Sequence, residues 1–181
     1  MVNRSSATGC SDATIDHLRM MLEEFLGYDT NLQTEIVDDH TQARQQTRSF
    51  LAMSDAPATI ITGGGGGTLR AVIEGICEGQ VTMHRDLPGG DRIRVAALRM
   101  GSGNILAKQF GVPLDPEQAL KGIVANLKEG RTAPCCVMRC EVGKKGSPPE
   151  VRYAVAMAGF GQFGRSPGDL ARWHRRLPVL R

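Results

Sequence analysis

Five consecutive glycines, Gly63 to Gly67, lie between a short run of β-branched residues and a segment with helical periodicity. The run "ATIIT" at 58–62 predicts a buried strand, and apolar residues at helical spacing predict a helix over 68–78. Polyglycine is typical of a flexible linker, but a linker seldom joins a strand directly to a helix. Glycines let a backbone approach an anion closely, and a helix N-terminus presents unpaired N–H groups to it. We therefore favour a phosphate-binding loop here, with a linker as the alternative.

The segment "ALRMGSGNILAKQFGVP" repeats this arrangement later in the chain. A strand predicted over 92–100 runs into the turn 101–104, and a short helix is predicted over 104–110. Ligands of open parallel sheets bind at the carboxyl ends of the strands, so two such junctions favour a ligand site at that edge. Turn and N-cap chemistry at Ser102 and Asn104 is a second interpretation, and it is compatible with the first.

Helices and strands alternate along the first part of the chain. This alternation predicts an α/β fold, a three-layer Rossmann-like nucleotide-binding domain whose parallel sheet is covered by helices. The other predicted elements are helices over 14–28, 38–53 and 115–130, a strand over 31–37, and the remainder of a first strand at Val2 and Asn3.

The sequence changes character after residue 133. Two predicted strands, 135–142 and 151–161, are joined by a turn rich in glycine and proline. Two strands are too few to form a stable β layer alone, so we expect this part of the chain to be a truncated domain. We therefore expect a nucleotide-binding domain over 1–133 and the beginning of a truncated, β-rich, lipid-binding second domain over 134–181.

Composition excludes several classes of protein. The 181 residues are 41% hydrophobic and 23% charged, which suits a soluble domain, and a net charge of +3 is too small to imply nucleic-acid binding. No run approaches the roughly 20 apolar residues of a membrane span. The five cysteines include no C-x-x-C, and "CCVMRC" reads as small apolar residues on a strand. We expect reduced cysteines in a cytoplasmic protein, and we assign no metal-ligating residue.

Both glycine junctions resemble signatures of one family. Residues 64–69, "GGGGTL", resemble the "GGDGTL" signature of the diacylglycerol kinase catalytic family, which includes sphingosine kinases and bacterial lipid kinases. "LRMGSGNILAKQFGVP" resembles its second signature, commonly "LPLGTGNDFARALGIP". "VNRSSATG" resembles its "NPxSG" opening loop, "PEQALKGI" its Asp-x-x-x-Ala-Leu helix, and "YAVAMAGFG" its "FxNxxxxGFD" strand. NAD kinases and phosphofructokinases share the first signature but not the second.

The resemblance implies a phosphotransferase that uses ATP to phosphorylate a lipid hydroxyl. ATP would lie on the glycine loop, Mg²⁺ would offset phosphate charge, and the lipid would bind between two domains. Such a protein is cytoplasmic or peripheral to a membrane surface. The nucleotide-binding residues that the resemblance implies are Asn3, Ser5, Gly64, Gly65, Gly66, Gly67, Thr68, Ser102, Gly103 and Asn104.

The chain also departs from the family pattern. Gly66 stands where the first signature has Asp, and "LRAV" replaces "LNEV", so Arg70 stands for Asn and Ala71 for Glu. Glycine can neither bind a metal nor orient a nucleophile, so the residues and the resemblance disagree about Mg²⁺. Arg70 either adds positive charge near the phosphates or is simply an exposed helix residue. The family's general base lies beyond the end of this chain, so the catalytic residues stay unknown.

Three functions stay open at this point. They are the ATP-binding half of a lipid kinase, a non-catalytic nucleotide- or anion-binding relative, and an enzyme similar to NAD kinases or sugar kinases.

The remaining residues have no assigned role in these functions. No sequence pattern around the histidines suggests a catalytic triad, so we expect them on the surface; they are His17, His40 and His84. The basic run "RWHRR" falls in a helix predicted over 167–177, which either is solvated or touches an anionic bilayer. A homodimer is a further open alternative.

Overall fold

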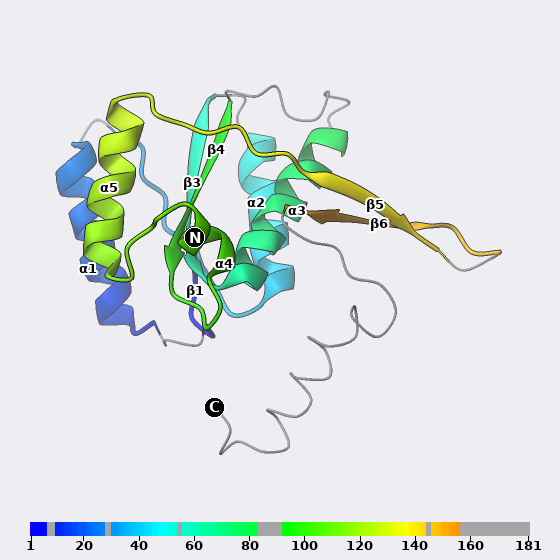
Figure 1. Ribbon diagram of the computed structural model, residues 1–181, viewed down its shortest axis with the longest axis horizontal. Coiled ribbons are helices and arrows are strands. Elements are labelled where there is room, and N and C mark those ends of the chain that lie inside the picture. The colour runs from blue at the N-terminus through cyan, green and yellow to red at the C-terminus, as the bar shows by residue number, and fades with distance from the viewer. Residues whose placement is uncertain (7–9, 28–29, 54–55, 83–91, 144–145, 156–181) are drawn as a thin grey trace, which may run out of the picture.

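Our computed structural model describes residues 1–6, 10–27, 30–53, 56–82, 92–143 and 146–155 (Figure 1). The helix predicted over 167–177, the end of the strand predicted over 151–161, and His84 lie outside these residues. The elements in chain order are β1 (Val2–Asn3), α1 (Asp12–Leu26), β2 (Ile36–Val37), α2 (His40–Met53), β3 (Ala58–Gly64), α3 (Gly66–Thr82), β4 (Ile93–Arg99), α4 (Ile105–Gln109), α5 (Pro116–Lys128), β5 (Met138–Val142) and β6 (Glu150–Ala154).

The first four strands form one parallel sheet in the order β2-β1-β3-β4. Helices α1 and α5 cover one face, and α2 and α3 cover the other, so the sheet is the middle of three layers (Figure 1). The α/β fold and its Rossmann-like arrangement are therefore confirmed. Because all four strands are parallel, their carboxyl ends meet at one edge, where the two glycine junctions also lie.

Apolar residues at helical spacing give each face of the sheet its own core. Ser11 and Asp115 cap α1 and α5 by accepting hydrogen bonds from the backbone N–H groups of Thr14 and Gln118. Pro116 occupies the first turn of α5, where its missing N–H leaves no unmade bond. The α1–α5 core consists of Cys10, Ile15, Leu18, Leu98, Met100, Ala119 and Leu120, and the α2–α3 core consists of Leu51, Ile60, Val72 and Ile76.

The strand predicted over 31–37 is much shorter than expected. Only Ile36 and Val37 form β2, because the neighbouring strand β1 offers only Val2 and Asn3 for pairing. Strand β3 pairs with β4 along its whole length, whereas its recorded pairing with β1 in the described chain is Val2 with Gly63. A cavity of about 510 Å³ borders residues 30–35 and the first half of β3. Its lining also includes Gly63 and Leu98, but no residue from the described part of α3.

The hairpin β5–β6 is antiparallel and packs against α3 (Figure 1). Tyr153 of β6 is buried against Ile73 and Cys77 of α3. Strand β5 begins three residues later than predicted, so Cys135 and Cys136 precede it and are exposed. The interpretation of "CCVMRC" as strand residues therefore holds only for its end, because the ladder with β6 reaches no further than Met138. The domain boundary after residue 133 stays a prediction.

No helix in the described part of the chain is long and apolar enough to cross a bilayer.

Candidate functional site

The five glycines form no extended loop. Strand β3 continues through Gly64 and α3 begins at Gly66, so Gly65 alone connects them. Gly63 and Gly64 pair with Leu98 and Arg99 of β4, since backbone pairing in a ladder requires no side chain. The carbonyl of Gly65 accepts a hydrogen bond from the N–H of Leu69 at 3.1 Å, the first bond of the helix. The five glycines thus form a sharp strand-to-helix junction, and phosphate binding there stays a prediction.

Three of these glycines are closely surrounded by other parts of the protein. A β carbon on Gly64 would lie 2.5 Å from Thr68 Oγ1, and one on Gly67 would lie 2.5 Å from His40 Nε2. Gly65 faces Gly101 of the second junction, whose own β carbon would lie 2.2 Å from the Cα of Gly65. A side chain at Gly64 or Gly101 would collide with neighbouring atoms, so close packing accounts for these two glycines before any ligand is considered. A side chain at Gly67 would require the His40 ring to move, and a β carbon on Gly65 would lie 3.2 Å from the Cα of Gly101, which is a tight contact.

Gly66 and Gly103 are different, because packing does not require them to be glycine. A β carbon at either position would meet no atom of the described residues within 4 Å, and neither residue has a positive φ. Both residues are exposed. Gly66 is the first residue of α3, where backbone N–H groups have no partner within the helix. Open space therefore lies beside unpaired donors at this helix start, which is an arrangement that admits an anion.

The second junction is closed by its own asparagine. The N–H of Gly101 donates to Asn104 Oδ1 at 3.0 Å, and Asn104 Nδ2 donates to the carbonyl of Gly101. Asn104 has a left-handed backbone, with φ of 52°, which asparagine tolerates better than most residues. Both ends of its side-chain amide are thus used to hold the turn, as the turn interpretation predicted. Ser102 and Gly103 are exposed beside it.

The opening loop is tied to the start of α3. Asn3 Nδ2 donates to Thr68 Oγ1 at 3.0 Å, and the N–H of Ser5 donates to Asn3 Oδ1 at 2.9 Å. Asn3 is 5% exposed and Thr68 is 1% exposed. Both side chains were expected to contact a nucleotide, but they contact each other, so their evident role is to position the junction. Among residues whose positions the structure describes, the buried Ser6 hydroxyl has no hydrogen-bond partner.

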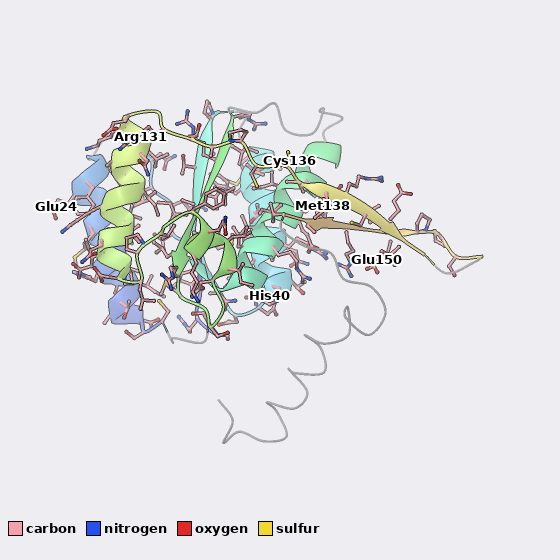
Figure 2. The ribbon with its side chains drawn as sticks, viewed as in Figure 1. Glu24, His40, Arg131, Cys136, Met138 and Glu150 are labelled. Carbon is pink, nitrogen blue, oxygen red and sulfur yellow. The ribbon has the colours of Figure 1, made fainter. Side chains whose placement is uncertain are left out.

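His40, labelled in Figure 2, is a site residue that its sequence pattern did not indicate. It is exposed, as expected, but its ring lies against the backbone of Gly67 in the first turn of α3. It is the first residue of α2, and Asp39 caps that helix by accepting from the N–H of Gln42 at 2.8 Å. His40 follows strand β2 closely, at the carboxyl edge of the sheet, and this position in the sequence could have predicted that it lies near the glycine junctions. His17, by contrast, pairs with Glu117 on the surface at 2.9 Å.

The described residues do not fit Mg²⁺, which prefers oxygen ligands such as carboxylates. At two positions where the family signatures have acids, Gly66 has no side chain and Ala71 is buried against Val37 and Ala43. No group of three His, Cys, Asp or Glu side chains suited to a metal occurs within the described ranges. Arg70, one helical turn beyond Gly66, is exposed.

The tertiary structure therefore brings together three of the predicted segments: the opening loop, the glycine junction and the turn 101–104. A family model described as the diacylglycerol kinase catalytic domain matches residues 1–135, a range that contains all three segments. No curated protein matches the chain. The match covers more than half of the chain, so this protein belongs to the diacylglycerol kinase catalytic domain family.

Proposed function

We propose that this chain forms the ATP-binding half of a lipid kinase, which transfers a phosphoryl group to a lipid hydroxyl. The observation that carries the proposal is the contact between Gly65 and Gly101 beside the open start of α3. It joins two glycine junctions from neighbouring strands into one surface at the carboxyl edge of the sheet, where nucleotides bind in open α/β folds. Membership of a lipid kinase family supports the same function.

In this proposal the phosphates of ATP lie over Gly66, where a β carbon would meet no atom of the described part of the chain within 4 Å. The unpaired N–H groups of the first turn of α3 donate to phosphate oxygens, and the partial positive charge of the helix start favours the anion. Ser102 and Gly103 close the other side of the nucleotide. Asn3 and Thr68 act as positioning residues, since their hydrogen bond holds the opening loop on α3.

Phosphoryl transfer depends mainly on positioning and on stabilising charge. The lipid oxygen forms a bond to the γ-phosphorus while the bond from that phosphorus to the bridging oxygen of ADP breaks. The hydroxyl proton must pass to a base. We propose that this base and the lipid-binding surface belong to the second domain that begins at residue 134.

The second candidate function is nucleotide or anion binding without catalysis. The absence of carboxylates at Gly66 and Ala71 favours it, because charge on the transferred phosphoryl group must then be stabilised by other means. The third sequence-based interpretation, an enzyme similar to NAD kinases, gains no support from the structure, because it offers no role for the junction at 101–104.

Two measurements separate the first two functions. Adding ATP should raise the melting temperature, since a ligand at a hundred times its Kd stabilises the folded state by about 2.7 kcal/mol. With the complete second domain present, labelled ATP should then transfer phosphate to at least one member of a panel containing diacylglycerol, sphingosine and ceramide. Stabilisation without transfer supports the non-catalytic function, and an unchanged melting temperature rejects both.

A further inference from the structure

We propose that the phosphate charge at this site is offset by His40 and Arg70 rather than by a divalent cation, so that nucleotide binding does not require Mg²⁺. The inference rests on the proposed nucleotide-binding function and specifies how this chain performs it.

The first step is the loss of acidic ligands at the site. Besides Gly66 and Ala71, a third position differs, since Ile105 stands where the "GTGND" part of the second signature has its Asp. Ile105 is 68% exposed, so a carboxylate there would have been accessible. Each replacement removes negative charge and an oxygen ligand beside the glycine junctions, which weakens any divalent cation site. The same changes make the surroundings more favourable for an anion.

The second step is the position of His40. A β carbon on Gly67 would lie 2.5 Å from both Cε1 and Nε2, so the far edge of the imidazole lies against the backbone of that glycine. Gly67 is the second residue of α3, within the turn whose N–H groups have no helical partner. An imidazole N–H at this place can donate to the same phosphate that the helix start holds. His40 would thus bind the nucleotide directly, from a different helix.

The third step is the position of Arg70. It follows Gly66 and Gly67 by four and three residues, a spacing that places it on the same face of α3. Its side chain is exposed, and no ion pair of Arg70 is recorded within the described chain. A guanidinium binds phosphate through two parallel N–H bonds and stays charged at all physiological pH values. His40 thus lies against Gly67, and Arg70 lies one helical turn beyond Gly66, so both residues belong to the neighbourhood of this helix start.

Two carboxylates near His40 reduce the positive charge that His40 and Arg70 can offer to a phosphate. Asp38 and Asp39 precede His40 and are exposed. Asp39 caps α2 by accepting from Gln42, whose own side-chain oxygen accepts from the N–H of Asp38 at 2.8 Å. These bonds hold the segment at the start of α2, and the two acids can neutralise part of a nearby cation. Arg70 is needed for that reason, because His40 alone would face two negative charges.

The test measures the Kd of ATP for the 181-residue protein by titration calorimetry, once with Mg²⁺ and once with EDTA. The Kd should change by less than about threefold between the two conditions. His40→Gln and Arg70→Gln should each weaken binding by about tenfold in EDTA, which corresponds to about 1.4 kcal/mol. The matched controls are His17→Gln, which lies on α1, and Arg94→Gln, which lies at the opposite end of β4 and pairs with Thr59. Both controls should bind ATP as the unmodified protein does.

Three outcomes would overturn the inference in distinguishable ways. Binding that occurs only with Mg²⁺ rejects it and leaves the nucleotide-binding function standing. Metal-independent binding that neither His40→Gln nor Arg70→Gln weakens rejects the assignment of these two residues. An absence of ATP binding in both conditions rejects the proposed function itself. Circular dichroism of each variant identifies any that fails to fold, and His40→Asn and Arg70→Ala then replace it in the same measurement.

Discussion

The backbones of Gly65 and Gly101 are in direct contact, so closely that a β carbon on Gly101 would lie 2.2 Å from the Cα of Gly65. One glycine connects β3 to α3 and the other follows β4. The contact fixes the distance between the two junctions, and thereby the geometry of the proposed nucleotide site. Glycine is required at this contact because one backbone packs directly on the other.

Replacing Gly101 with alanine should therefore destabilise the protein. The added methyl group would force Gly65 away, and overpacking of this kind costs about 1–3 kcal/mol. Urea unfolding monitored by circular dichroism measures the change. Gly103→Ala is the matched control, since a β carbon there meets nothing within 4 Å and should alter stability by no more than about 0.5 kcal/mol. Equal effects of the two substitutions would contradict the packing argument.

Removing the Thr68 hydroxyl should release the opening loop. Thr68→Val keeps the shape but leaves Asn3 Nδ2 buried without its acceptor, which costs about 1–3 kcal/mol. Asn3→Ala should cost a similar amount, and the double variant should cost clearly less than the sum, because one bond is lost in each case. Denaturant unfolding of all four proteins gives the coupling free energy. Thr41→Val, on the exposed side of α2, serves as the control, and additive losses would show that the bond is unimportant.

Restoring the family carboxylate should create a metal dependence. Gly66→Asp places an acid in open space at the start of α3, where the helix dipole also favours it by about 0.3–1 kcal/mol. ATP binding by this variant should become about tenfold tighter with Mg²⁺ than with EDTA, a difference of about 1.4 kcal/mol. Gly66→Asn, which has the same size without the charge, should show no such dependence. If both variants respond alike to Mg²⁺, the correspondence of Gly66 with the family Asp is wrong.

The cysteines should differ sharply in their reaction with alkylating reagents. Burial raises the pKa of the Cys77 thiol to about 11, so at pH 8 it remains protonated and unreactive in the folded protein. Cys135 and Cys136 are exposed and should be labelled first. Mass spectrometry of peptides after timed labelling measures each rate. Fast labelling of Cys77 at pH 8 would mean that α3 is not covered as described.

Removing Tyr153 should expose Cys77 selectively. Truncating a buried aromatic side chain typically removes about 3–5 kcal/mol of packing, which here holds the hairpin on α3. In Tyr153→Ala the labelling of Cys77 should accelerate by more than about tenfold through local opening. Cys10 provides the internal control, because it lies in the α1–α5 core on the other face of the sheet. Equal acceleration at both cysteines would indicate global unfolding instead.

Much of the fold was predictable because its signals are local. Apolar residues at helical spacing predicted α1, α2 and α5 to within a few residues, and Asp115 with Pro116 marks the start of α5 in the sequence itself. The strands β3 and β4 were equally clear, since a short apolar run next to glycine is typical of a buried strand. The length of β2 was not predictable from local sequence. A strand extends only where its neighbour offers pairing partners, and β1 offers two residues.

The sequence by itself determined the α/β class, the positions of both glycine junctions and the absence of acids at Gly66 and Ala71. These follow from residue identity and from spacing along one stretch of chain. Only the tertiary structure decided that Gly65 lies on Gly101, that Asn3 binds Thr68, and that His40 lies on Gly67. The physical reason is that these contacts join segments from different strands and helices. They depend on the order in which the strands lie in the sheet, and no local pattern carries that order.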